Sequence, residues 1–437
     1  MTVHLRDVEV DGEITDVCES EGRITALGRG ECAHRTGGPP PVTVDGAGAA
    51  LLPGLHDHHV HVLALAAAWD SINCGERLDA LRTAPGTGWV RGVNAAVSVD
   101  RHALDAVVPD RPVRVQHRSG GLWMLNSAAL AAVAHVLDDS ADVERDPAGE
   151  PTGRLWRYDE RLRPALPDAS PDLQAVGRRL AARGITGVTD ATPDLDPTAV
   201  ALLRQLPQRL LLLGDPLGEG PRKLLLRDHD LPTFDELTAT IAAAHALPRP
   251  LAIHCVTRES LLLTLAALED VGVVPGDRIE HAAICPPEAA DWLTRLGVAV
   301  VTQPDFLRTR GSAYLRDVSP HDLPHLYPHA RLLAAGVRTT ASSDAPFGEV
   351  DPWRVIATAA ERPIGAEESV RPRAALDGYL SAPLDPGGPA RRVAPGAPAD
   401  LVLLDAPLEV ALRSPVAVTV RATWIAGERI HGGQSAG

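Results

Sequence analysis

The stretch Pro53–His61, which reads Pro-Gly-Leu-His-Asp-His-His-Val-His, determines how the rest of the chain is interpreted. It ends an apolar run with the composition of a buried strand. Residues two apart in a strand point to the same face, so His59 and His61 would present two imidazoles side by side. His56 and His58 have the same spacing, but they lie further from the end of the run. Imidazole is a common ligand of zinc and similar metals, so the stretch predicts a metal site at a strand end.

The region after this stretch alternates apolar, β-branched runs with helical runs rich in Ala and Leu, as in parallel α/β folds. Eight strands are predicted: Leu51–His61, Ile185–Asp190, Arg209–Gly214, Lys223–Asp228, Leu251–Val256, Arg278–Ala282, Val298–Gln303 and Arg338–Asp344. Eight such units predict a (β/α)8 TIM barrel, in which chemistry sits at the C-terminal ends of the strands. Residues 63–180 do not follow the repeat and are interpreted as an insertion between the first two strands, with one clear strand at 112–116.

Both ends of the chain resemble short strands separated by turns. Neither end could bury a face alone, so we expect residues 1–53 and 386–437 to form one small composite β-sandwich domain. The metal-binding barrel would then occupy residues 54–385.

Polar side chains lie on several of the later predicted strands: Lys223 begins one, and His254 and His281 lie near the ends of the next two. Lys223 and His254 are 31 residues apart, and His254 and His281 are 27 apart. A βα unit of a barrel takes roughly 30 residues, so these three fall on successive strands. Asp344 ends the eighth strand. Any one strand-end histidine is more often structural than a ligand, but the matching registers favour a shared site at the mouth of the barrel.

Lys223 is the single lysine among 42 Lys and Arg residues. Composition alone is equally consistent with drift towards arginine. However, a lysine amine can be neutralised or modified, whereas a guanidinium stays charged. The position of Lys223, one barrel step before His254, favours a function that arginine could not perform.

The motifs PGLHDHHVH, HCVT, RIEH and SSDAP, together with the single lysine and the strand-rich ends, resemble the amidohydrolase superfamily. Within it the chain is similar to the YtcJ-like branch, amidohydrolase family 3. The resemblance implies a hydrolase acting on carbon–nitrogen bonds other than peptide bonds, by a metal-activated hydroxide. It implies one or two divalent ions, most simply Zn²⁺, bound by these residues: His59, His61, Lys223, His254, His281 and Asp344.

The resemblance also assigns roles within this set. Lys223 would be carboxylated by CO2 and bridge two metals, and His281 would complete the catalytic group. Asp344 would act as proton shuttle, taking the proton of the attacking water and passing it to the leaving amine.

Substrate contacts are predicted less directly. The branch often has a histidine where Gly121 stands, and His117 is the expected substitute. Further candidates are an arginine beside it, two aromatic residues, and residues after the seventh strand: Arg118, Trp123, Tyr314, Gln303 and Arg310. The arginines could bind an anionic group by bidentate contacts.

Composition limits partners and compartment. The formal charge of −15 and the 3% aromatic content disfavour nucleic acid and anionic membranes. The N-terminal residues show no signal-peptide pattern, and no apolar run reaches the ~18 residues that span a bilayer. Five cysteines without a CxxC pair suggest no disulfide framework. We therefore expect a cytoplasmic enzyme with a small-molecule substrate, and a homo-oligomer is left open.

Two other functions remain open from the sequence. One is a deaminase of heterocyclic amines that uses a single metal on His59, His61, His254 and Asp344, with Lys223 unmodified. The other is a non-catalytic relative that keeps the barrel for assembly, although such proteins usually lose ligands.

Overall fold

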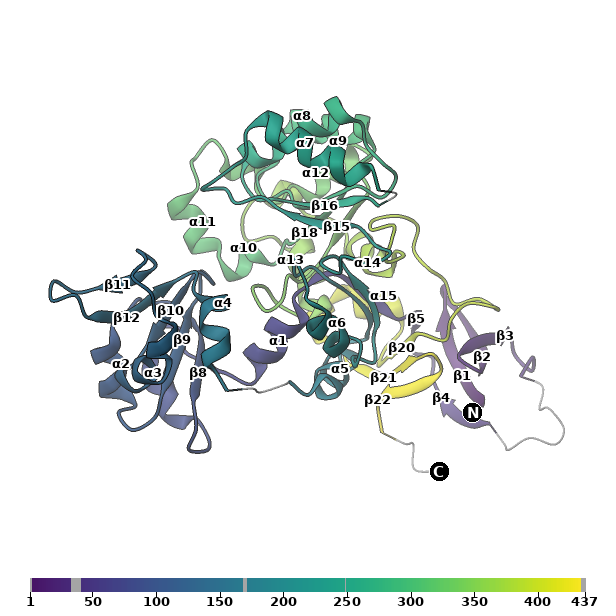
Figure 1. Ribbon diagram of the computed structural model, residues 1–437. Coiled ribbons are helices and arrows are strands. Elements are labelled where there is room, and N and C mark those ends of the chain that lie inside the picture. Colours follow the sequence, from purple (N-terminus) through teal and green to yellow (C-terminus); the bar gives the residue numbers. More distant parts are fainter. Residues whose placement is uncertain (1, 33–40, 168–170, 248, 434–437) are drawn as a thin grey trace. The chain divides into compact units, whose positions relative to one another are not determined.

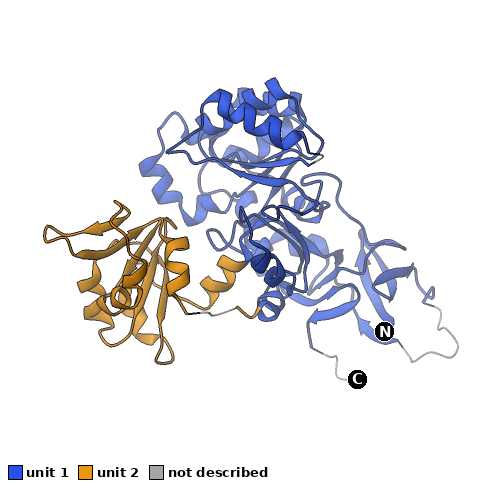
Figure 2. Cartoon of the chain, viewed as in Figure 1, with its two compact units in different colours: residues 1–62, 173–437 blue, residues 63–172 orange. Residues whose placement is uncertain are grey.

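The computed structural model describes residues 2–32, 41–167, 171–247 and 249–433. The chain divides into two compact units (Figure 2). Unit 1 comprises residues 1–62 and 173–437, and unit 2 comprises residues 63–172. Helix α1 (Val62–Trp69) spans the boundary between them.

Unit 1 contains eight parallel strands in two sheets. The first sheet has the order β14–β13–β6 and the second β15–β16–β17–β18–β19. Their bounds are β6 Leu55–Val60, β13 Ile185–Asp190, β14 Arg209–Leu212, β15 Arg222–Leu225, β16 Leu251–Cys255, β17 Arg278–His281, β18 Ala299–Thr302 and β19 Thr339–Ala341. Each of the eight predicted strand segments therefore contains a parallel strand.

Backbone hydrogen bonds join the edges of the two parallel sheets on both sides. On one side Lys223 N donates to Leu213 O at 2.9 Å, between the ends of β14 and β15. On the other side Asp344 N donates to His59 O at 2.8 Å, and His61 N donates to Ala345 O at 2.9 Å. These bonds bring the C-terminal ends of β6 and β19 together.

Helices follow most of these strands (Figure 1). The described helices of unit 1 after α1 are α5 Leu173–Ala181, α6 Pro197–Leu203, α7 Phe234–His245, α8 Arg258–Val271, α9 Pro287–Leu296, α10 Phe306–Thr309, α11 Gly311–Asp317, α12 His329–Ala334, α13 Pro352–Ala360, α14 Pro372–Leu380 and α15 Leu408–Arg413, of which α5 precedes β13 and α15 follows β20. Capping boxes fix the starts of α7 and α8, at Thr233 with Glu236 and at Thr257 with Ser260. The apolar faces of α7, α8 and α9 share a buried cluster with Ile253, Ile279 and Val300 of the strands.

The predicted strand Leu51–His61 forms two strands rather than one. Residues Leu51–Pro53 are β5, which pairs with β20 (Leu401–Leu404) in a different sheet, and β6 begins at Leu55. Gly54 separates them because a Cβ there would lie 2.1 Å from the Thr186 side chain. The close approach of β13 therefore requires glycine at the crossing from one sheet to the other.

The two ends of the chain form two four-stranded sheets. One has the order β3–β2–β1–β4 and the other β22–β21–β20–β5. The remaining bounds are β1 Thr2–Val10, β2 Glu13–Ser20, β3 Arg23–Leu27, β4 Val42–Asp45, β21 Val420–Ile425 and β22 Glu428–His431. Val3, Leu5 and Val17 of the first sheet share a buried cluster with Leu401 and Trp424 of the second.

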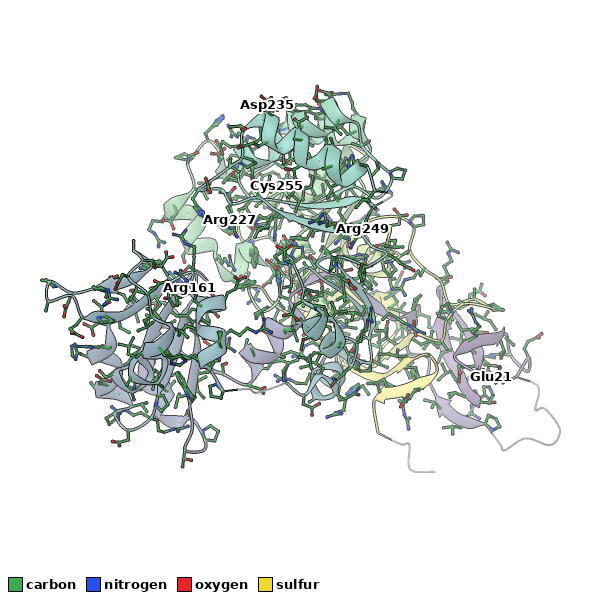
Figure 3. The ribbon with its side chains drawn as sticks, viewed as in Figure 1. Glu21, Arg161, Arg227, Asp235, Arg249 and Cys255 are labelled. Atoms are coloured by element: carbon green, nitrogen blue, oxygen red, sulfur yellow. A yellow bond between two sulfur atoms is a disulfide. The ribbon has the colours of Figure 1, made fainter. Side chains whose placement is uncertain are left out.

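The cysteines correct one expectation. Cys18 and Cys32 form a disulfide with Cα atoms 5.6 Å apart, although the sequence pattern suggested none. The pairing depends on β2 and the segment after β3 lying side by side, which the cysteine spacing does not reveal. Among the described residues Cys74, Cys255 and Cys285 are free and buried. Cys255 ends β16 (Figure 3), and its Sγ lies 3.3 Å from Thr264 Oγ1.

Unit 2 is built on a six-stranded mixed sheet with the order β11–β12–β10–β9–β8–β7. Its elements are β7 Ile72–Asn73, β8 Val90–Ala95, β9 Val113–His117, β10 Leu122–Leu125, β11 Val143–Arg145, β12 Pro151–Trp156, α2 Arg101–Val107, α3 Ser127–Val133 and α4 Asp159–Leu162. The sequence predicted one strand here. The others were missed because they are short and interrupted by glycine, arginine and asparagine, which weakens the period-two pattern.

Short 3₁₀ helices complete the two units: η1 Leu78–Thr83, η2 Ala134–Val136, η3 Arg163–Ala165, η4 Leu323–His325, η5 Ala366–Glu368 and η6 Pro415–Ala417. Within the described ranges, none of the helices combines the length and the apolar character needed to cross a membrane.

Candidate metal centre

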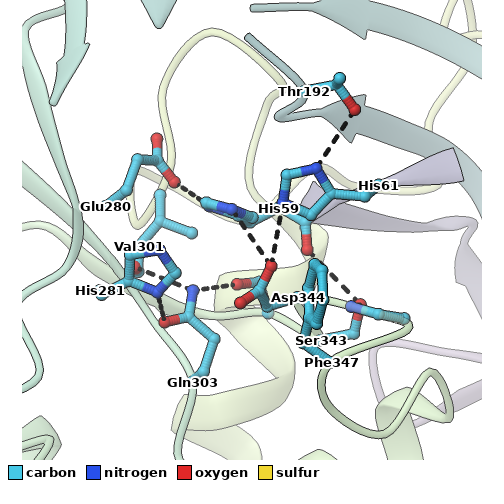
Figure 4. A network of polar contacts seen from close by, with 12 residues as sticks. His59, His61, Thr192, Glu280, His281, Val301, Gln303, Ser343, Asp344 and Phe347 are labelled. Atoms are coloured by element: carbon cyan, nitrogen blue, oxygen red, sulfur yellow. Dashed lines mark hydrogen bonds and ion pairs between the residues drawn. The ribbon is translucent and has the colours of Figure 1, made fainter. Parts of the chain in front are cut away.

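The C-terminal ends of the parallel strands bring a set of imidazoles and a carboxylate together in unit 1 (Figure 4). His59, His281 and Asp344 each offer a ligand atom, and these atoms lie within 4.8 Å of one another. Asp344 Oδ1 is 3.4 Å from His59 Nε2 and 3.3 Å from His61 Nε2. The ring of His254 lies 4.5 Å from that of His281, centroid to centroid. Among the described residues this is the cluster whose donor atoms could bind a metal ion.

Two donor atoms of this cluster, and the amine of Lys223, which couples electrostatically to it, are buried without a hydrogen-bond partner among the described residues. His59 Nε2, Lys223 Nζ and Asp344 Oδ1 are inaccessible to solvent and make no hydrogen bond within the described residues. A buried polar atom without a partner costs roughly 1–3 kcal/mol, and more for a charged group. Such atoms at the end of a parallel sheet indicate a site whose ligand satisfies them.

Burial sets the protonation state of these groups. It lowers the pKa of His254 to about 4 and that of His281 to about 3, and it holds the pKa of His59 well below its ordinary value. It also lowers the pKa of the Lys223 amine. For Asp344 burial raises the pKa, but the neighbouring histidines outweigh it and hold the pKa below its ordinary value. Neutral imidazoles and an ionised carboxylate are the forms that bind metals.

The second nitrogen of three of these histidines is hydrogen bonded. His59 Nδ1 donates to Glu280 Oε2, and His281 Nδ1 donates to Gln303 Oε1 at 2.7 Å (Figure 4). His61 Nδ1 lies 3.2 Å from Thr192 Oγ1. Because Nδ1 of His59 and of His281 carries the proton, Nε2 is left as the electron-pair donor in both rings. Partners of this kind orient metal-binding histidines in known sites.

Glu280 was not singled out from the sequence. Because neighbouring residues of a strand point to opposite faces, strand alternation gives no signal for Glu280 beside His281. The backbone of His281, the last residue of β17, has φ +74°, a left-handed conformation. Asp344 has φ +50°. Left-handed backbone at non-glycine residues is unfavourable and concentrates at functional sites.

Asp57 was also missed, although it lies inside the histidine-rich stretch. Its Oδ1 accepts hydrogen bonds from His59 N at 3.3 Å and Ser343 N at 3.2 Å. Burial raises the pKa of Asp57 to about 6. This side chain ties the end of β6 to the segment that carries Asp344.

The residues predicted to bind substrate are divided between the two units. In unit 1, Gln303 is buried against His281, Arg310 donates to Phe347 O at 2.9 Å, and Tyr314 shares a hydrogen bond of 2.9 Å with Tyr327. In unit 2, His117 is hydrogen bonded to Ser119, Arg118 is exposed, and Trp123 is buried with its Nε1 donating to Asp159. Phe347 was not predicted: it is 40% exposed and its ring contacts that of His61.

Comparisons with known proteins agree with this architecture. The profile described as Amidohydrolase family matches residues 42–431. An N-substituted formamide deformylase from Arthrobacter pascens is 26% identical, with 89% of each chain covered. The putative amidohydrolase YtcJ of Bacillus subtilis is 23% identical over 82% of each chain.

A solved structure of similar fold is a metal-dependent hydrolase from Pyrococcus horikoshii, with a TM-score of 0.73 and 19% identity over 96% of this chain and 99% of that one. The fold and the family profile together define a hydrolase of the amidohydrolase type with a candidate metal centre. The chain belongs to the amidohydrolase family, in its YtcJ-like branch. It is an enzyme of the amidohydrolase type, acting on carbon–nitrogen bonds other than peptide bonds.

Proposed function

We propose that this enzyme hydrolyses the C–N bond of a small amide, formamide, cyclic amide or carbamate-like substrate at a metal centre in unit 1. The observation that carries the proposal is the group of buried polar atoms without a hydrogen-bond partner among the described residues: His59 Nε2, Lys223 Nζ and Asp344 Oδ1. The similarity to an N-substituted formamide deformylase supports a substrate of this chemical class.

The residues present fit a divalent ion, most simply Zn²⁺, as one or two ions. Imidazole nitrogen and carboxylate oxygen are ligands that zinc accepts, and His61 and His254 add two further rings to His59, His281 and Asp344. A bound divalent ion supplies Lewis acidity, which lowers the pKa of a water molecule and polarises the substrate carbonyl.

Lys223 serves this centre as an anionic ligand in the proposal. Its buried amine has a lowered pKa, which increases the neutral fraction able to react with CO2. The amine nitrogen forms a bond to the carbon of CO2 and releases one proton, leaving a carbamate with two oxygens. Arginine, which keeps its charge, could not provide this group.

Asp344 is the proposed proton shuttle. Held ionised between His59 and His61, it can take a proton from the attacking water and then deliver it to the leaving amine nitrogen. Gln303 keeps the proton of His281 on Nδ1, so that this ring faces the centre with its bare nitrogen. His117, Arg118, Trp123, Arg310 and Tyr314 remain proposed substrate contacts.

We also propose the domain architecture of the enzyme and the cellular compartment in which it acts. The hydrogen bonds between the two parallel sheets support one eight-stranded (β/α)8 barrel, and the cluster shared by the terminal sheets supports a β-sandwich. The composite domain would be residues 1–53 with 386–437, and the barrel 54–385 with its insertion at about 63–180. The three unpaired cysteines support a cytoplasmic enzyme, although Cys18–Cys32 stands against a fully reduced chain.

Metal analysis tests the function. We expect the purified enzyme to contain divalent metal, to lose formamide or amide hydrolysis on chelation and to regain it with Zn²⁺. The Asp344→Asn variant isolates the proton transfer and should lose activity by about 10²–10⁴-fold. Activity unchanged in metal-free protein would refute the proposal, and an intact mass without CO2 on Lys223, with one ion bound, would favour the deaminase.

A further inference from the structure

Unit 2 holds two arginines beside one buried tryptophan. Arg91 of β8 and Arg114 of β9 are direct partners in a parallel pair of strands. Trp123 of β10 pairs with Gln116, two residues from Arg114 along β9, so these side chains project from one face of the sheet. The Cζ atoms of Arg91 and Arg114 lie 5.5 and 5.2 Å from the centroid of the Trp123 ring.

The two guanidinium groups lack an anionic partner among the residues that the structure describes. Arg91 Nη1 donates to Ser71 Oγ at 3.0 Å, but its Nε is buried without a partner. Arg114 makes no hydrogen bond or ion pair in this part of the chain, and both side chains are half-buried. The nearest carboxylates are exposed, and that of Asp159 already accepts the Nε1–H of Trp123 at 2.7 Å.

The two neighbouring positive charges of Arg91 and Arg114 therefore repel each other, without a contacting anion among the described residues to offset the repulsion. Burial lowers the pKa of Arg91, and burial together with the charge of Arg91 lowers the pKa of Arg114 to about 10. Both groups still carry their charge at neutral pH, so deprotonation cannot relieve the repulsion. Asp159 and the exposed Asp70 offset it only from a distance. Stacking on Trp123 attracts each cation weakly, and apart from the bond from Arg91 to Ser71 it leaves the N–H groups without an acceptor among the described residues.

We propose that Arg91, Arg114 and Trp123 form a binding site for an oxyanion, the carboxylate or phosphate group of a small molecule. A guanidinium group binds a carboxylate or a phosphate through two parallel N–H···O bonds. The Trp123 ring, on which both side chains stack, keeps the two guanidinium groups side by side. The Ser71 hydroxyl accepts from Arg91 and donates to Ala67 O, so it holds the Arg91 guanidinium group in place and leaves its other N–H groups for the anion. The inference concerns unit 2 alone and goes beyond the proposed hydrolysis.

Isothermal titration of the full-length, metal-loaded enzyme tests the site. Sodium phosphate and sodium acetate are titrated separately at constant ionic strength, with chloride as background anion. We expect saturable binding of at least one of them, weakened at least about tenfold in Arg91→Met and in Arg114→Met, since a hydrogen bond to a charged group contributes roughly 1.5–3 kcal/mol. Arg77→Met is the matched control, because Arg77 is 80% exposed and pairs with Asp79.

The two titrations distinguish the kind of group that the site binds. Binding of phosphate alone indicates a phosphate site, binding of acetate alone indicates a carboxylate site, and binding of both indicates a site for either group. Absence of binding by either anion overturns the proposal. Binding that persists unchanged in both arginine variants also overturns it, because the anion would then be bound elsewhere.

Thermal melting gives a second, folding-sensitive readout. Without added oxyanion Arg114→Met should melt at or above the temperature of the unsubstituted chain, because it removes a like charge. Phosphate or acetate should stabilise the unsubstituted chain and Arg77→Met only. If Arg114→Met melts lower and the unsubstituted chain does not respond to either anion, the arginines serve packing alone and the proposal fails.

Discussion

The buried ion pair between Arg278 and Glu280 makes a prediction that separates stability from metal binding. Their side chains are 1% and 0% exposed, and Arg278 Nε donates to Glu280 Oε1 at 2.6 Å. The other oxygen of Glu280 accepts from His59 Nδ1. Replacing Glu280 by Gln keeps an acceptor for His59 but leaves the Arg278 guanidinium in the interior without an anion. Removing one partner of such a pair costs about 3–5 kcal/mol.

The double variant Arg278→Met with Glu280→Met gives the comparison. It removes both charges and keeps similar volumes, a change that is often neutral or stabilising. It also loses the bond of 3.2 Å from Arg278 Nη2 to His58 O, which costs about 1 kcal/mol. We therefore expect the double variant to be more stable than Glu280→Gln by about 2 kcal/mol or more, as measured by the urea midpoint of metal-free protein.

Zinc affinity should follow a different order. Both variants lose the carboxylate that orients His59, so both should bind zinc about 10–100-fold more weakly in competition with a chelator. Asp377→Asn, which removes one acid of an exposed i,i+4 pair with Arg373, is the control and should shift stability by no more than about 0.5 kcal/mol. If the double variant is as unstable as Glu280→Gln, the unpaired charge of Arg278 is not the cause of the instability. If zinc affinity is unchanged in both variants, Glu280 does not orient His59 for metal binding.

Two further predictions concern single residues. Lys223→Arg keeps the charge but cannot be carboxylated, so kcat/KM should fall by more than about a hundredfold and the mass of one CO2 should be absent; full activity would contradict the proposed ligand. His329 is 1% exposed, and burial followed by repulsion from Arg362 lowers its pKa to about 4. Below pH 6.5 His329 binds a proton in the unfolded chain but stays neutral in the folded one. Its contribution to the free energy of unfolding, fully present above pH 6.5, therefore decreases as the pH falls towards 4, by up to about 3 kcal/mol. His329→Gln should lose less stability between pH 7 and pH 4.5 in urea unfolding, and an equal loss would contradict this assignment.

The parallel strands and the candidate ligands could be predicted because both depend on local pattern. Apolar β-branched runs specify buried parallel strands, and polar residues at their ends must meet at one edge of a sheet. The spacing of Lys223, His254 and His281 follows from the length of a βα unit. No tertiary information was needed for these inferences.

The residues that were missed depend on departures from regular geometry or on pairing between distant segments. Glu280 of β17 meets His59 of β6 although 221 residues separate them in the sequence, and no local pattern marks that contact. The division of the first strand at Gly54 depends on Thr186, which is 132 residues away in the sequence. Arg91 and Arg114 become neighbours only through the register of β8 and β9. Short strands rich in arginine and glycine give no pattern from which that register could be predicted.

The lysine and the two arginines show why the identity of a buried cation matters. Among the described residues, Lys223 Nζ and Arg91 Nε are buried without a hydrogen-bond partner, and the half-buried Arg114 has no anionic partner at contact distance. An amine in that position can lose its proton and become a nucleophile towards CO2. The buried positive charge is then removed by deprotonation and replaced by the negative charge of a carbamate. A guanidinium cannot lose its proton, so its charge must be met by an anion from outside the pair. All of the other Lys and Arg positions of this chain are arginine. On the two proposals, the single lysine stands where loss of the charge is useful, and the arginine pair stands where a permanent charge is required.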